Sequence, residues 1–197
     1  CVYGGNKANI KPGYIRYVDV NHDGEINSKD RVILGNSTPR YEYSFTLGGQ
    51  WKGIDLSLFF QGVGKRDLYY SGAGARPLVQ NSTIFKSQLD TWSPENPDAE
   101  YPLLLVDAGS TNMNNIVSSF WIKSGAYLRL KNLTVGYTLP KKWTNRVSID
   151  NLRLYFTASN LFTINNGYKG YDPETGVTSG AMYPVMKTFN FGINLDF

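Results

Sequence analysis

The chain has 197 residues with a formal net charge of +4, 41% hydrophobic residues, 14% aromatic residues and a single cysteine. This charge is small for the length, and the sequence has no cluster of lysine or arginine that would indicate nucleic-acid binding. The mean hydropathy of -0.33 and the lack of an apolar run of about 18 residues exclude a helical membrane protein, and one cysteine excludes an internal disulfide.

The first element along the chain is a twelve-residue segment, 19–30, with the spacing of a calcium-binding loop. Side-chain oxygens stand at its positions 1, 3 and 5, and Gly24 at position 6 permits the sharp turn that such loops need. Position 7 offers a backbone carbonyl, and position 12 offers a carboxylate. The predicted ligands of a structural Ca²⁺ ion are Asp19, Asn21, Asp23, Glu25 and Asp30.

This loop departs from the usual pattern at its last position. Asp30 replaces the usual glutamate, and its shorter side chain predicts weaker calcium binding. An Asx-rich turn without metal is the alternative, because Asp, Asn and Gly favour turns for their own backbone reasons. We favour the metal site because the motif is nearly complete. His22, the only histidine, stands at a position that points away from the ion, so we expect it to face solvent.

Five later segments alternate apolar and polar residues, as strands with one wet and one apolar face do. Only Lys52 and Gly53 separate the first two segments, as a tight hairpin requires. In the third segment Leu128 and Leu130 have the opposite phase to Leu133, which predicts a β-bulge near residues 131–132. We predict strands at about 41–51, 54–62, 127–139, 151–160 and 188–197.

The last predicted strand has the length of a membrane crossing. Ten residues at roughly 3.3 Å each, tilted by about 45°, cross roughly 25 Å, the height of the apolar band of an outer-membrane barrel. Ile193 is then expected to face lipid and Asn194 the lumen. A half-buried strand in a soluble sandwich gives the same alternation. The repetition of the pattern in five segments favours the membrane.

The connections between these segments alternate between short and long. The turn at residues 52–53 and about ten residues from Pro140 are short, whereas 63–126 and 162–187 are long. Transmembrane barrels place short turns on the periplasmic side and long loops outside, which predicts a periplasmic C-terminus. Five strands cannot close a barrel, because an open edge cannot face lipid. We therefore expect an all-β fold that is the C-terminal piece of a larger protein.

Several stretches occur in an order that is specific to one protein family. They include Thr91-Trp-Ser-Pro-Glu-Asn-Pro97, Gly170-Tyr-Asp-Pro-Glu174 and the segments 17–31, 55–62, 119–140, 159–162 and 188–197. With these stretches the chain resembles the C-terminal part of the SusC/RagA family of TonB-dependent outer-membrane transporters from Bacteroidetes. The resemblance spans nearly the whole chain.

The resemblance implies a 22-stranded transmembrane barrel, of which this chain supplies about the last five strands within residues 41–197. Residues 1–40 would be an extracellular loop that carries the calcium loop. It further implies import of oligosaccharides or peptides through the cell outer membrane, driven by the TonB complex, with a SusD-like surface lipoprotein as partner. The plug domain and TonB box of the family do not occur in this sequence, so energy coupling cannot be read from it.

Four aromatic residues in the long connections could either bind sugar or pack within the protein. Their flat faces match sugar rings, yet aromatic residues also pack within loops and at membrane interfaces, and packing is the expected role. They are Trp92, Trp121, Tyr168 and Tyr171.

We predict no enzyme, because one histidine, one cysteine and no serine-centred elbow leave little for nucleophilic catalysis. The rival hypothesis is a secreted, calcium-dependent, carbohydrate-binding β-sandwich module. Such a module would show inward apolar faces too, but it would need no regular alternation of short and long loops.

Overall fold

A computed structural model describes residues 2–3, 10–71, 76–78, 84–105, 113–144, 148–165, 167, 172–175, 183 and 185–197. Its main element is one antiparallel sheet of five strands in the order β3-β4-β7-β8-β9. The strands are β3 (Glu42–Trp51), β4 (Ile54–Val63), β7 (Tyr127–Thr138), β8 (Asn151–Asn165) and β9 (Thr188–Asp196). The all-β fold class and the antiparallel sheet are thereby confirmed.

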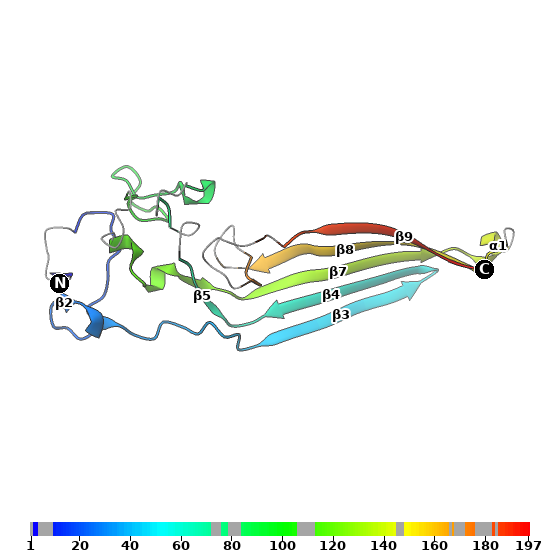
Figure 1. The fold of residues 1–197 in the computed structure, drawn as a ribbon, viewed down its shortest axis with the longest axis horizontal. Helices are drawn as coiled ribbons and strands as arrows, with labels where there is room; N and C mark the ends of the chain where they lie inside the picture. The colour runs from blue at the N-terminus through cyan, green and yellow to red at the C-terminus, as the bar shows by residue number, and fades with distance from the viewer. Residues whose placement is uncertain are drawn as a thin grey trace.

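The strands run side by side along the long axis of the molecule, with short connections at one end and long ones at the other (Figure 1). The β3–β4 turn, the short helix α1 (Lys141–Thr144) between β7 and β8, and the C-terminus lie at the same end. In the tight turn Lys52 has φ 50° and Gly53 has φ 85°. Positive φ at both central residues is the turn geometry that matches the twist of a two-residue hairpin.

The register places most apolar residues of the five strands on one face. Phe59 and Tyr155 are exceptions and lie on the opposite face. One row across the sheet joins Leu47, Leu58, Leu133 and Ala158 to Phe189. The next rows toward the β3–β4 turn continue in the same way, because side chains two residues apart share a face. Serine, threonine, asparagine, glutamine and charged residues alternate with them on the opposite face. We call these two surfaces the apolar face and the polar face.

The predicted β-bulge in the third strand is confirmed at Lys131. The register of β7 shifts between Leu130 and Asn132 against both β4 and β8. Leu130 and Leu133 are three residues apart and would point to opposite faces in a regular strand. The extra residue at the bulge places both on the apolar face, with Leu130 opposite Phe60. On β8 the matching irregularity includes Asn160, which has φ 54°.

The long connections form a separate small core beyond the sheet. Leu68, Tyr70, Tyr101 and Trp121 are all at most 5% exposed and pack on one another. Short strands β5 (Asp67–Tyr69) and β6 (Ile122–Ser124) pair antiparallel beside this core. At the N-terminal end β1 (Val2–Tyr3) pairs with β2 (Glu25–Ile26). The described parts of the loops at this end of the sheet are therefore folded.

Within the part of the chain that the structure describes, no helix has the length and apolar character needed to cross a membrane.

Candidate functional site

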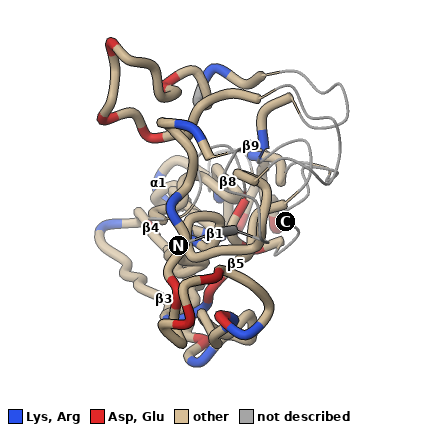
Figure 2. The backbone as a smooth tube through the Cα atoms, turned by 90° about the vertical axis from the view of Figure 1, so that its left-hand side faces the viewer, with Lys and Arg blue, Asp and Glu red and all other residues tan. Residues whose placement is uncertain are grey.

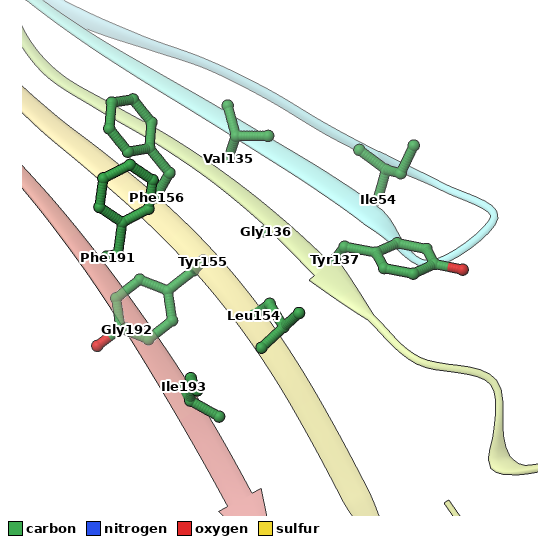
Figure 3. A pocket seen from close by; sticks show the side chains of 10 residues that line it. All are labelled: Ile54, Val135, Gly136, Tyr137, Leu154, Tyr155, Phe156, Phe191, Gly192 and Ile193. Carbon is green, nitrogen blue, oxygen red and sulfur yellow. The ribbon is translucent and has the colours of Figure 1, made fainter. Parts of the chain in front are cut away.

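The apolar face of the sheet is uncovered, which is unusual for a sheet in a soluble protein. Phe191 is 84% exposed and Ile193 is 63% exposed, and Leu154 beside them is 43% exposed. Figure 3 shows these side chains with their neighbours from four strands around a hollow of about 810 Å³. A contiguous exposed apolar surface of this kind indicates contact with a protein or a membrane.

Aromatic residues border the apolar face at both ends. Trp51 and Tyr137 lie next to the short connections, and Tyr43 and Phe162 lie next to the long ones. Between Tyr43 and Trp51 the outward residues of β3 are apolar or glycine. Aromatic girdles that flank an apolar band are typical of strands that cross a bilayer.

The polar face carries an ion pair near the β3–β4 turn. Arg153 on β8 donates to both carboxylate oxygens of Asp55 on β4, over 2.9 Å from Nε and 2.6 Å from Nη2. Gly136 of β7 lies beneath them, and a Cβ added there would be 2.5 Å from Nη2 of Arg153. A larger residue at this position would displace the two side chains, since they pass directly over the backbone. The pair joins three adjacent strands.

A larger ion network lies on the polar face at the other end of β7. The Arg129 side chain is 4% exposed. Its Nε donates to Thr163 Oγ1 over 2.7 Å, its Nη2 donates to both oxygens of Asp172 over 2.7 Å, and its Nη1 donates to Glu174. The bulge residue Lys131 donates to the second oxygen of Glu174 over 2.5 Å. Two cations of one strand thus meet two carboxylates of one loop.

Sequence reasoning missed this network. No role was assigned to Glu174 or to Arg129. The available signal was the phase of β7 before the bulge: with Leu128 and Leu130 on the apolar face, Arg129 between them lies on the polar face.

The predicted calcium loop is closed by its own side chains. Asp19 Oδ2 accepts from the backbone N–H of Gly24 over 2.8 Å, and Asp23 Oδ1 accepts from Glu25 over 2.9 Å. Asn21 Oδ1 accepts from the N–H of Asp23 over 3.1 Å. These contacts turn the loop twice, with positive φ at His22 (60°) and Gly24 (87°).

Asp30 caps the end of this loop. Its two oxygens accept from the backbone N–H groups of Asn27 over 2.7 Å and Val20 over 2.9 Å. The hydrogen bond from Asn27 is the main cause that lowers the pKa of the Asp30 carboxyl below its ordinary value. The group therefore stays ionised at neutral pH.

The oxygen donors of the loop suit calcium chemically, because Ca²⁺ prefers carboxylate, amide and carbonyl oxygens. Among the described residues, however, no three carboxylate, histidine or cysteine side chains are grouped as ligands of one ion. The loop backbone is thus formed, while Asp19, Asp23 and Asp30 bond to backbone N–H groups and do not converge on one point.

The two aromatic candidates that the structure describes pack within the loops. Trp121 is 1% exposed and its indole N–H donates to the carbonyl of Asn114 over 2.8 Å, so it belongs to the loop core. Trp92 is half-buried against Gly13, where an added Cβ would collide with the indole ring. Tyr168 and Tyr171 lie outside the described residues.

Charges at the loop end are mixed. Figure 2 looks along the sheet from this end and shows Lys/Arg and Asp/Glu in both the upper and the lower loops. No surface of one sign dominates this view, which agrees with the small net charge of the chain.

No protein-family model matches the chain. It is 33% identical to TonB-dependent receptor P3 of Formosa agariphila, over 94% of this chain and 19% of that receptor. It is 29% identical to TonB-dependent receptor SusC of Bacteroides thetaiotaomicron, over 96% of this chain and 18% of SusC. Among solved structures it is similar to the RagAB peptide importer in the 'open-open' state, with a TM-score of 0.66 and 27% identity over 93% of this chain and 20% of that one. The chain spans about a fifth of the length of these relatives.

Proposed function

Because this chain belongs to the family of TonB-dependent receptors that includes SusC and RagA, we propose that it forms part of an outer-membrane importer. In this proposal the apolar face of the sheet contacts lipid and the polar face lines the lumen of a closed barrel. The long connections lie outside the cell, and the short turns and the C-terminus lie in the periplasm. The observation that carries the proposal is the single uncovered apolar face, bordered by aromatic residues.

The rival β-sandwich module is not favoured by this sheet. A sandwich buries its apolar face against a second sheet about 10 Å away. Among the described residues, no second sheet covers the five-stranded one. The relatives are receptors and an importer, which also argues against a catalytic function.

The finer part of the proposal concerns substrate and partners. One structural neighbour is a peptide importer, and another relative is SusC. We propose oligosaccharides or peptides as the substrate class, a SusD-like surface lipoprotein as the partner and the TonB complex as the source of energy. The TonB complex would act through parts of the receptor that lie outside this sequence.

Deletion of the complete gene tests this function. We expect loss of uptake of one class of oligosaccharide or peptide, while hydrolysis of the same polymer at the cell surface continues. The measurement is uptake of fluorescently labelled oligomers by the mutant and by a strain complemented with the gene. Normal uptake of every class, or turnover of glycans by the purified protein at enzyme-like rates, would contradict the proposal.

We also propose that residues 19–30 bind Ca²⁺ as a structural ion outside the cell. The spacing of oxygen donors and the turned backbone support it, and binding would require the carboxylates of Asp19, Asp23 and Asp30 to converge. Extracellular calcium modules bind with dissociation constants of about 10⁻⁴ to 10⁻³ M. In the bound state the carboxylates would bind the ion in place of backbone N–H groups, and the ion would hold this exposed loop in one conformation.

Limited proteolysis of the full-length receptor tests the calcium proposal. Trypsin cuts after Lys29 and Arg31, and we expect millimolar Ca²⁺, but not Mg²⁺, to slow these cuts in the wild type. The double variant Asp19→Asn and Asp23→Asn should lose this protection. Asp98→Asn, an exposed substitution in another loop, is the matched control and should retain it. Equal cleavage with Ca²⁺ and with a chelator in the wild type would leave the loop as an Asx-rich turn without metal.

A further inference from the structure

The four residues 172–175 form a tight turn that lies against the polar face of the sheet. The N–H of Glu174 donates to Asp172 Oδ1 over 2.9 Å, and Thr175 Oγ1 donates to the carbonyl of Asp172 over 3.0 Å. Pro173 between them is buried. The turn is therefore closed by its own hydrogen bonds and packed on its inner side. We call residues 172–175 the inner turn.

Side chains of β7 and of the segment after β4 hold the inner turn. Arg129 of β7 binds both of its carboxylates and also bonds to Thr163 of β8. Arg66, which follows β4, donates from Nη1 to the carbonyl of Pro173 over 3.4 Å. The turn is thus held by β7 and by the segment that follows β4, and it cannot leave the sheet without breaking a charged network.

The side of the sheet that the inner turn occupies follows from the register. Arg129 lies between Leu128 and Leu130, both of which have partners on the apolar face, so its guanidinium is on the polar face. Arg129 also lies directly opposite Thr163, to which it is bonded. The inner turn therefore lies over the surface that faces the lumen in the proposed function.

Burial of the guanidinium makes the attachment strong. All three nitrogens of Arg129 donate to acceptors, and bidentate contacts between arginine and carboxylate are geometrically specific as well as strong. Leaving a buried charge without its partners is costly. The two cations of β7 and the two carboxylates of the turn also cancel in charge, so the attached turn leaves no net charge from these four groups.

We propose that the inner turn is a fixed constriction at the lumen mouth, held by Arg129 and Lys131, and that it limits the size of the solute that passes along this wall. The inference rests on the proposed barrel. Arg129 and Lys131 act as positioning residues, because they hold the turn and contact no substrate in this assignment. Residues 172–175 then narrow the path along this wall.

Labelling of a cysteine below the turn tests the constriction in the full-length receptor in intact cells. Asn132→Cys places a thiol on the polar face next to the network, in a background with Cys1→Ser and no other cysteine. Two reagents are compared, a small charged maleimide and a maleimide carried on a long polyethylene glycol. In the wild-type background we expect the small reagent to react and the large one to be excluded.

Releasing the turn should admit the large reagent. With Arg129→Met, and with the milder pair Lys131→Met and Glu174→Gln, we expect its labelling rate to rise about tenfold or more, since the rate follows the population of the released form. Arg153→Met removes the other ion pair of the polar face and is the matched control, with no change expected. Heat-modifiable gel mobility restricts the comparison to folded receptor.

The outcomes separate this inference from the proposed function. Labelling by the large reagent in the wild-type background, or its exclusion from every folded variant, would overturn the constriction while leaving the barrel intact. A thiol that reacts only with lipid-soluble maleimides would mean that the polar face does not line an aqueous lumen, and the proposed function would fail with it.

Discussion

Arginine in place of Ile193 is expected to lower the free energy of unfolding of the full-length receptor by about 2–4 kcal/mol, the cost of a cation on the lipid face near the bilayer midplane. Ile193 lies in the middle part of β9, opposite Leu154, and 63% of its surface is exposed on the apolar face. If lipid covers this face, the guanidinium loses its water and gains no partner. The folded fraction, read from heat-modifiable gel mobility in isolated outer membranes, should fall.

The matched control is Asn190→Arg, three residues earlier on the same strand. Asn190 lies opposite Thr157 on the polar face, where an aqueous lumen tolerates charge. It is a cleaner control than Asn194, because Asn194 lies opposite Arg153 and a second arginine there would add like-charge repulsion. Equal folded fractions for the two variants, or a larger loss for Asn190→Arg, would show that the apolar face does not contact lipid.

The sheet was predictable from sequence because its information is local. An alternation with a period of two assigns each side chain to a face without any knowledge of the partner strand. The same alternation revealed the bulge, since Leu128 and Leu130 cannot share a face with Leu133 in a regular strand. The two-residue turn at Lys52 and Gly53 was equally local, as few residues other than glycine adopt the positive φ that Gly53 has.

The end of β8 shows where local patterning stops. The pattern predicts a strand to about residue 160, whereas β8 continues to Asn165. Asn160 is a residue type that interrupts strands, and here it adopts the left-handed conformation. The strand nevertheless continues beyond it, because β7 has a bulge at the same level. Phe162 and Ile164 thereby pair with Leu130 and Leu128, a match that only the two strands together specify.

The contacts of the loops could not be predicted for a related reason. Arg129 and Asp172 are 43 residues apart, and the turn that contains Asp172 has no periodic pattern that would indicate a partner. Packing was the expected role of Trp121, with stacking on a sugar as the alternative, and its burial beside Tyr70 and Leu68 identifies it as core. The type of a side chain indicates which groups it can bind, whereas the fold determines which of those groups lie within contact distance.

Neutralising Asp172 and Glu174 together is expected to destabilise the receptor more than removing Arg129. The double variant Asp172→Asn and Glu174→Gln leaves the Arg129 side chain, which is 4% exposed, without either carboxylate, and an unpaired buried charge costs about 3–5 kcal/mol. Arg129→Met leaves two carboxylates whose side chains are 21% and 27% exposed. They retain water, and Glu174 retains Lys131, so we expect a smaller loss of about 1–3 kcal/mol.

The triple variant with all three substitutions separates a coupled network from independent contacts. Replacing a whole buried ion group by neutral residues of similar size is often close to neutral, so the triple variant should be more stable than the double variant. Urea midpoints of the detergent-solubilised receptor, followed by heat-modifiable mobility, measure all three. A triple variant less stable than the double variant would mean that Arg129 stabilises the sheet through packing alone, and that its charge does not hold the inner turn.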